Sequence, residues 1–204
     1  MNWETIMCFG DSITIGSRSM LAYPEYCGHF LSTETKKKWN VVNHAKAGFT
    51  TIDLVRSINN NFFNLKSFKP EIATIMIGTN DLKSNTSISD FQIAYTQVII
   101  KARLIVGSSN IILIKIPKLL EGVMLPYKIE MNERIEEFNH LIQDIGNKES
   151  LIVEKMNSNC SDFYDGVHLN DIGSKNWGKQ LADVITNMRY SKELNNAKGI
   201  VATK

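Results

Sequence analysis

Residues 72–81 of the chain read Ile-Ala-Thr-Ile-Met-Ile-Gly-Thr-Asn-Asp, an apolar run that ends in small and polar residues. An uncharged run rich in β-branched side chains is typical of a central parallel strand that helices cover on both faces. Because the carboxyl ends of parallel strands meet along one edge of a sheet, we expect the Gly-Thr-Asn-Asp cluster at a ligand-binding edge. The stretch therefore predicts an α/β fold with a site where this strand ends.

Four further apolar runs are separated by longer segments with apolar residues at helical spacing. The runs are Thr5 to Phe9, Asn40 to Asn43, Ile111 to Ile116 and Leu151 to Val153. Short strands that alternate with longer helices are the signature of βαβ units around a parallel sheet. Residues 72–77 and 111–116 are expected at the centre of this sheet of five strands.

Three segments carry the helical period. Ser89 to Val106 predicts a helix laid on the sheet through Phe91, Ala94, Tyr95, Val98, Ile99, Ala102 and Ile105. Ile129 to Ile145 repeats the pattern through Ile135, Phe138, Leu141, Ile142 and Ile145. A last helix is expected from an N-cap at Asn170 to about Met188, with Trp177, Leu181, Val184 and Ile185 facing the core.

The composition bounds the class of protein. A chain of 204 residues with 43% hydrophobic residues can bury a sizeable core, and residues 1–188 are expected to form a single domain. Residues 189–204 lack a sustained apolar period and are expected to be a weakly ordered tail. The formal net charge of +2 is too small to indicate a nucleic acid or an anionic membrane as a partner.

The sequence also bears on the cellular location of the protein. No apolar stretch reaches the roughly 20 residues needed to span a bilayer, and few residues precede Thr5, too few for a signal peptide. The three cysteines are odd in number and widely spaced, which argues against a disulfide framework. We expect a cytoplasmic protein without stable membrane insertion; its oligomeric state stays open.

Two polar clusters provide a nucleophile and a base. Gly10-Asp11-Ser12 closes the first strand, and a serine hydroxyl is a poor nucleophile unless a base lies within hydrogen-bond reach. Among the four histidines, His168 alone has a carboxylate three residues before it, at Asp165. That carboxylate could accept from one ring nitrogen and hold the other toward Ser12. Because a base must be neutral to accept a proton, activity is expected to rise near pH ~6.5, where an unperturbed imidazole titrates.

Two further clusters provide donors for a developing oxyanion. Asn80 follows the central strand and can direct its side-chain amide into the same edge. The backbone N–H groups of Ser12 and Gly48 are the other candidates, since a residue without Cβ lets a substrate approach the backbone closely. One preorganised donor contributes about 3 kcal/mol to an acyl-transfer transition state.

These four segments resemble the sequence blocks of the SGNH hydrolase superfamily, the GDSL-type esterases and lipases, from Gly10 to His168. The resemblance implies a flavodoxin-like three-layer α/β/α sandwich with a five-stranded parallel sheet in the order 2-1-3-4-5. It implies Ser12 as nucleophile and first oxyanion donor, and Gly48 and Asn80 as the other donors. His168 is then the base, and Asp165 orients it.

The blocks depart from the family pattern at two places. Ile13 stands where the family name has Leu, and Lys46 stands where a small or polar residue is usual. We expect Lys46 to be exposed to solvent. Asp11 and Asp81 are expected to secure loops by accepting backbone N–H bonds, without a catalytic role.

The expected activity is a serine hydrolase that cleaves carboxylic esters of small or carbohydrate-linked acyl groups through an acyl-enzyme on Ser12. An acetyl group on a sugar or glycan is the preferred substrate, and neither a cofactor nor a metal is expected. The alternatives are a lysophospholipase or thioesterase, and an acyltransferase that uses the same triad. A binding protein that lost turnover, a nucleotide site, and a metal site at Asp162, Asp165 and His168 are weaker hypotheses.

The segment Pro117 to Lys128 bears on the acyl chain length. It carries more apolar surface than a solvated loop exposes, in Leu119, Leu120, Val123, Met124 and Leu125. We expect this loop to pack on the body. The alternative is that it forms a wall of an acyl pocket or a lid, which favours a longer acyl chain.

Overall fold

Five parallel strands form one sheet in the order β2-β1-β3-β4-β5, in a computed structural model that describes residues 3–107 and 110–201. The strands are β1 (Trp3–Gly10), β2 (Lys38–Ala45), β3 (Ile72–Met76), β4 (Ile111–Ile114) and β5 (Ile152–Glu154). The parallel sheet and its strand order confirm the expected fold class. Gly10 pairs with Ala45 on one side and with Met76 on the other, so three strands end side by side at one edge.

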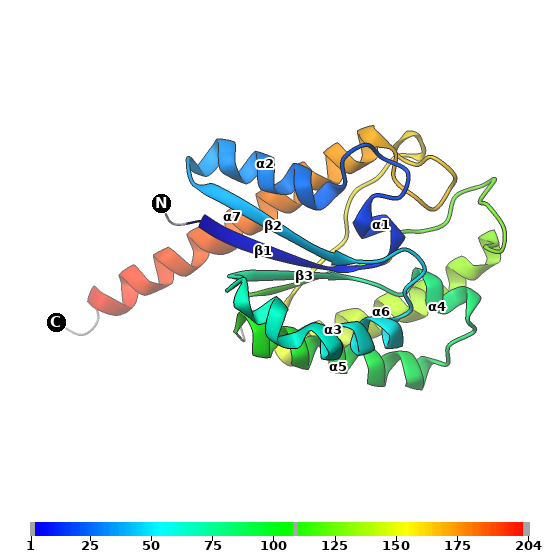
Figure 1. The fold of residues 1–204 in the computed structure, drawn as a ribbon, viewed down its shortest axis with the longest axis horizontal. Coiled ribbons are helices and arrows are strands. Elements are labelled where there is room, and N and C mark those ends of the chain that lie inside the picture. Colours follow the sequence, from blue (N-terminus) through cyan, green and yellow to red (C-terminus); the bar gives the residue numbers. More distant parts are fainter. Residues whose placement is uncertain (1–2, 108–109, 202–204) are drawn as a thin grey trace.

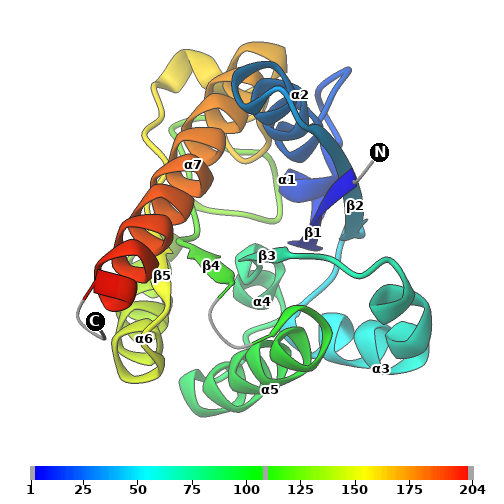
Figure 2. The same cartoon turned by 90° about the vertical axis from the view of Figure 1, so that its left-hand side faces the viewer.

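Helices cover both faces of the sheet and complete a three-layer sandwich (Figure 1). Helices α2 (Tyr23–Thr35) and α7 (Asp171–Val201) pack together on one face. Helices α3 (Thr51–Ser67), α5 (Ile88–Val106) and α6 (Asn132–Glu149) lie on the other, as Figure 2 shows along the sheet. No helix of the described ranges is long and apolar enough to cross a membrane.

The helix over residues 88–106 confirms the face expected from its apolar spacing. All seven apolar residues of that face are buried, and Phe91 stacks on Phe138 of α6 with ring centroids 4.0 Å apart. On α6 and α7 the expected core residues are buried, except that Leu141 and Val184 are half-buried. Asn170 caps α7 as expected, because its Oδ1 accepts from the N–H of Gly173 at 3.0 Å.

Two one-turn helices follow the strands that end at the site. Helix α1 (Ser12–Ile15) begins two residues after β1 ends, and α4 (Thr79–Lys83) begins three residues after β3 ends. Two 3-10 turns, at Ile129–Met131 and Cys160–Asp162, lie in the connections before α6 and α7. The short helices place their first residues at the carboxyl edge of the sheet.

The strand ends lie within two residues of those expected, and α6 covers Asn132–Glu149 where Ile129 to Ile145 was expected. Two of the differences involve specific contacts. The strand expected over 111–116 stops at Ile114, because the amide of Asn139 binds both backbone groups of Ile116, accepting from its N–H at 2.8 Å and donating to its carbonyl at 2.9 Å. The last helix continues past Met188 to Val201. Arg189 forms ion pairs with Glu4 and with Glu71, the latter at 2.8 Å.

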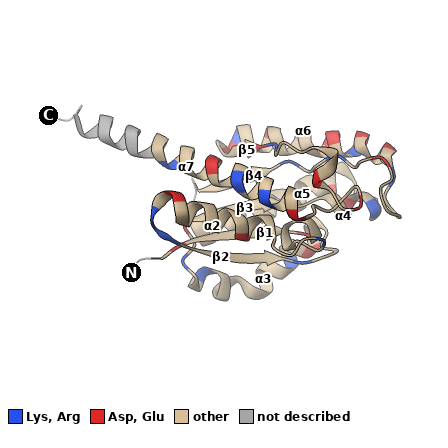
Figure 3. Cartoon of the chain, turned by 90° about the horizontal axis from the view of Figure 1, so that it is seen from above, with Lys and Arg blue, Asp and Glu red and all other residues tan. Residues whose placement is uncertain are grey.

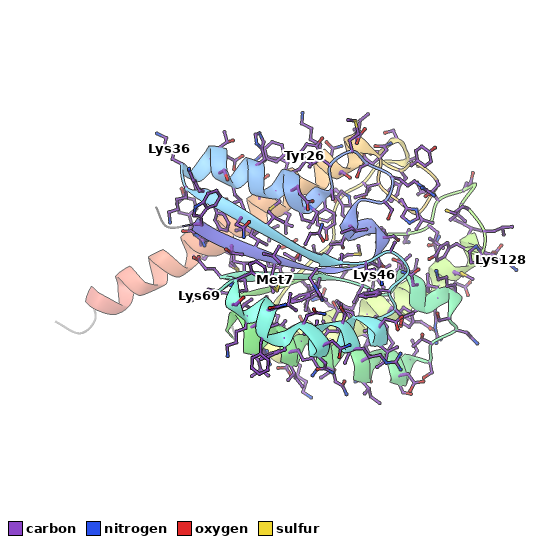
Figure 4. The ribbon with its side chains drawn as sticks, in the orientation of Figure 1. Met7, Tyr26, Lys36, Lys46, Lys69 and Lys128 are labelled. Atoms are coloured by element: carbon purple, nitrogen blue, oxygen red, sulfur yellow. The ribbon has the colours of Figure 1, made fainter. Side chains whose placement is uncertain are left out.

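Positions of Lys and Arg alternate with positions of Asp and Glu along the helices in Figure 3. Lys46 is exposed at the carboxyl end of β2, as expected, and Figure 4 shows it beside the start of α3. The three cysteines are free thiols, with Cys8 and Cys27 buried and Cys160 exposed.

Candidate active site

Ser12, His168 and Asp165 form one continuous chain of hydrogen bonds. Ser12 Oγ lies 2.9 Å from His168 Nε2, and His168 Nδ1 lies 2.8 Å from Asp165 Oδ2. Asp11 caps α1 by accepting from the N–H of Ile13 at 3.0 Å, which holds the turn that presents Ser12. The structure thus brings together a serine and an Asp/His pair from opposite ends of the sequence.

The turn that carries Asp165 and His168 is closed by its own backbone. Tyr164 donates to the carbonyl of His168 at 2.8 Å, and Phe163 bridges Leu169 in antiparallel fashion. Asp165 Oδ1 accepts from the N–H of His168 at 2.8 Å. The carboxylate therefore shapes the turn and contacts the imidazole ring at the same time.

The protonation of the pair follows from its hydrogen bonds. Burial acts to raise the pKa of Asp165, but donation from the backbone and ring of His168 outweighs it and the pKa is lowered. The ionised carboxylate only accepts, so the proton of a neutral His168 lies on Nδ1 and Nε2 is the acceptor. The hydroxyl of Ser12 then donates to His168, which is the arrangement of a nucleophile and its base.

The guanidinium of Arg18 lies close to this pair. Its Nε is 3.6 Å from Asp165 Oδ2, and its Cζ is 5.9 Å from the centroid of the Tyr164 ring. Side-chain exposure of Arg18 is 47%, so solvent screens much of this charge. No motif of the sequence pointed to Arg18.

Asn80 and its neighbour Asp81 join α4 to the loop before α3. Asn80 Nδ2 donates to the carbonyl of Phe49 at 2.9 Å. Asp81 Oδ2 accepts from the N–H and the hydroxyl of Thr51, at 2.9 and 3.0 Å. These bonds hold the loop that contains Gly48 against the start of α4.

Two glycines of the site have positive φ angles for different reasons. Gly78, at φ 133°, precedes α4, and a Cβ there would lie 2.5 Å from Ile116 Cδ1. Gly48, at φ 84°, would bring its Cβ within 4 Å of no atom. Gly78 leaves room for the side chains of Ile116 and Phe91, whereas Gly48 leaves an open approach to the backbone.

Three N–H groups remain available beside Ser12. The N–H of Ser12 starts α1 and has no acceptor within that helix. The N–H of Gly48 donates to no acceptor within residues 3–107 and 110–201. The second hydrogen of Asn80 Nδ2 is also uncommitted once the first is given to Phe49. These are the donors expected for a developing oxyanion.

A pocket of about 330 Å³ opens in front of Ser12 and His168. Its lining includes Gly48, Asn80, the loop residues Met124, Leu125, Pro126 and Tyr127, and the charged residues Arg18 and Lys83. The loop 117–128 was expected either to pack on the body or to form a wall of the pocket, and each expectation holds for one part of it. Leu119 is buried in the body, whereas Met124 and Leu125 are exposed and form a wall of the pocket.

The remaining candidates lie outside the hydrogen-bonded chain. Asp11 and Asp81 accept backbone N–H bonds, as expected, and burial raises the pKa of Asp11 to about 7. Asp162 is not joined to His168, since its oxygens accept from Asn159 and Asn176. Within the ranges that the structure covers, no group of three potential metal ligands is found.

Sequence reasoning missed Tyr127 altogether. Its hydroxyl lies 2.9 Å from Asn80 Oδ1, although the two residues are far apart in the sequence. Tyr127 follows no predicted strand, so no spacing rule points to it. The apolar content of its loop was the one signal available.

The fold and the site define a class of enzyme, the α/β/α hydrolases whose polar residues gather at the carboxyl edge of a parallel sheet. The chain belongs to the GDSL-like lipase/acylhydrolase family, whose sequence model matches residues 8–175. It is accordingly a GDSL-type carboxylic ester hydrolase, as the resemblance implied. No curated protein sequence matches the chain.

Solved structures support the same fold. A lipase/acylhydrolase from Enterococcus faecalis is similar with a TM-score of 0.74 and 23% identity, over 90% of this chain and 96% of that chain. The acetyl xylan esterase AlAXEase is similar with a TM-score of 0.72 and 18% identity, over 89% of this chain and 99% of that chain. Axe2, an acetylxylan esterase from Geobacillus stearothermophilus, is similar with a TM-score of 0.64 and 18% identity, over 91% of this chain and 93% of that chain.

Proposed function

We propose that the enzyme is a serine hydrolase that acts through an acyl-enzyme on Ser12. The observation that carries the proposal is the hydrogen-bonded chain from Asp165 through His168 to the Ser12 hydroxyl. His168 Nε2 takes the proton of Ser12 Oγ as that oxygen attacks the ester carbonyl. Asp165 keeps the ring in the required tautomer and stabilises the imidazolium that forms.

The same groups complete the reaction. The tetrahedral oxyanion receives hydrogen bonds from the N–H groups of Ser12 and Gly48 and from Asn80 Nδ2. When the intermediate collapses, the alcohol leaves with the proton that His168 holds. Water then gives a proton to His168 and attacks the acyl-enzyme, and return of that proton to Ser12 Oγ releases the carboxylic acid.

For the substrate, we infer a small acyl group, with an acetyl group on a sugar or glycan preferred. The pocket of about 330 Å³ is modest, and its walls come from loops of the same domain. Acetyl xylan esterases are among the proteins of similar fold, in line with this preference.

A second candidate is hydrolysis of longer acyl chains, as in a lysophospholipase or thioesterase. The observation in its favour is the pocket wall made by Met124 and Leu125, whose exposures are 39% and 79%. Transfer of the acyl group to an acceptor alcohol requires the same residues and differs in how well the site excludes water.

The test is hydrolysis of p-nitrophenyl esters from acetate to long chains, by the wild type and by Ser12→Ala. Turnover of short esters that Ser12→Ala abolishes supports the proposal, and a preference for long chains supports the second candidate. A Ser12→Ala variant as active as the wild type overturns both. Product partition with a sugar alcohol in the assay separates hydrolysis from transfer.

A further inference from the structure

The amide of Asn80 is held on both sides. Nδ2 donates to the carbonyl of Phe49 at 2.9 Å, and Oδ1 lies 2.9 Å from the hydroxyl of Tyr127. A carbonyl oxygen only accepts, so Nδ2 must face Phe49 and Oδ1 must face Tyr127. The hydroxyl of Tyr127 is therefore the donor, and its proton is committed to Asn80.

Tyr127 keeps this proton under ordinary conditions. The residue is 6% exposed, and its contact with Asn80 is buried although the ring lines the pocket. Burial, together with the negative charges of Asp11 and Asp165, raises the pKa of Tyr127 to about 12. The hydroxyl is accordingly protonated at neutral pH and remains a donor there.

We propose that Tyr127 is a positioning residue that holds Asn80 ready to stabilise the oxyanion. This inference rests on the proposed function, in which Asn80 Nδ2 is one of the oxyanion donors. The Tyr127 hydroxyl opposes rotation of the amide and leaves one Nδ2 hydrogen free for the oxyanion. Donation to Oδ1 also polarises the amide and strengthens its N–H groups as donors.

The loop that carries Tyr127 is fastened independently of this bond. Asn132 binds both backbone groups of Leu119, at 2.8 and 2.9 Å. Farther along the loop, Met124 donates to the carbonyl of Asp165 at 3.3 Å and accepts from the N–H of Tyr127 at 3.1 Å. One loop therefore contacts both the acidic residue of the triad and the amide of Asn80.

The Tyr127 ring has a second role that must be separated from the hydroxyl. It forms part of the pocket wall, and Lys83 Nζ lies 6.0 Å from its centroid. Tyr127→Phe keeps the ring and removes only the donor, so it tests the proposal without opening the pocket.

The experiment compares kcat and KM of the wild type, Tyr127→Phe, Asn80→Ala and the double variant on a short p-nitrophenyl ester. Loss of one neutral hydrogen bond is expected to lower kcat about tenfold in Tyr127→Phe, with KM within about twofold of wild type. In the Asn80→Ala background the Tyr127→Phe change should have no further effect. A kcat within about twofold of wild type, or the same loss in both backgrounds, overturns the proposal.

A second measurement reports the oxyanion directly. A boronic acid that adds to Ser12 forms a tetrahedral anion, and its affinity should fall in Tyr127→Phe by the same factor as kcat. An unchanged affinity contradicts the proposal. Tyr95→Phe is the matched control, because Tyr95 is fully buried and, among the described residues, its hydroxyl has no partner; this variant should keep the wild-type kcat.

The outcomes separate the two levels of the proposal. Full activity of Ser12→Ala overturns the proposed function itself. If Ser12→Ala and Asn80→Ala lose activity while Tyr127→Phe keeps it, the proposed function stands and only the role of Tyr127 is wrong.

Discussion

His168 donates to Asp165 twice, from its backbone N to Oδ1 at 2.8 Å and from its ring Nδ1 to Oδ2 at 2.8 Å. The first bond shapes the turn and the second orients the imidazole. A substitution at Asp165 therefore changes both the local fold and the tautomer of the base, and the two effects are separable by the choice of replacement.

Asp165→Asn is expected to preserve the turn and to lower the catalytic activity. The amide oxygen can still accept from the His168 backbone, but Nδ2 then faces the ring and places the imidazole proton on the wrong nitrogen. The kcat for ester hydrolysis should fall by about 10⁴, as expected for the wrong tautomer of a triad histidine. Steady-state kinetics with a circular dichroism check test this, and a loss below about tenfold contradicts the orienting role.

Asn80→Ala is expected to lower kcat by about two to three orders of magnitude, the usual cost of one oxyanion donor. The variant also leaves the carbonyl of Phe49 and the hydroxyl of Tyr127 without their partner. The free energy of unfolding should therefore fall by about 1–3 kcal/mol. Urea unfolding and kinetics on the same preparation distinguish these effects. Unchanged kcat in a destabilised variant would leave Asn80 a purely structural residue.

Asp11→Asn is expected to flatten the pH dependence of stability. Burial raises the pKa of Asp11 from 3.8 to about 7 in the folded protein. The folded pKa is the higher one, so the stabilisation from this group is full below pH 3.8 and is lost as pH rises through about 7. The loss is on the order of 4 kcal/mol at most, from roughly three pKa units.

The measurement is urea unfolding of the wild type and of Asp11→Asn at pH 5 and pH 8. Relative to the wild type, the free energy of unfolding of the variant should be higher at pH 8 than at pH 5. Other groups titrate alike in the two proteins and cancel in this comparison. Parallel curves for the two proteins would show that Asp11 does not titrate in this window.

Gly48→Ala and Gly78→Ala are expected to differ sharply in stability. Both positions have positive φ, which costs an alanine roughly 1–2 kcal/mol. At Gly78 the methyl group would also lie 2.5 Å from Ile116 Cδ1 and 3.0 Å from Phe91 Cε2, so a further loss of about 1–3 kcal/mol is expected there. Gly48→Ala should fold, because its Cβ meets nothing within 4 Å. Thermal melts check the order, and equal losses contradict it.

Truncation tests the extent of the domain. Residues 1–188 are proposed to form the catalytic domain, and every residue proposed for the site precedes Leu169. A chain that ends at Met188 should keep its kcat but unfold more easily than one that ends at Ser191. The shorter chain lacks Arg189, which contacts Glu4, Glu71 and the Trp39 ring. Equal stability of the two chains would show that these contacts contribute nothing.

The strands and the gathering of polar residues at one edge could be predicted from local patterns, whereas the order of the strands came from the family resemblance. The apolar run that ends at Ile77 identifies a buried strand, and parallel pairing brings its end next to the end of the first strand at Gly10. Residues Ser12 and Asn80 follow those two ends directly. The tight turn from Asp165 to His168 needs no long-range information, since both residues lie within it.

Other features depend on contacts that no local pattern contains. The strand over 111–114 stops because Asn139 of a later helix binds Ile116. The partnership of Tyr127 with Asn80 requires the path of a loop that has no regular period. The last helix runs to Val201 although its apolar face fades after Met188, so periodicity placed its end too early.

The pocket wall from Met124 to Tyr127 separates the choice of substrate from the integrity of the fold. Leu125 is 79% exposed at the middle of this wall. The loop is instead held through its backbone, where the side chain of Asn132 binds the N–H and the carbonyl of Leu119. Directed evolution toward bulkier or longer acyl groups would therefore find its tolerated mutations at Met124 and Leu125. Substrate specificity can therefore change while the residues proposed for the reaction stay in place.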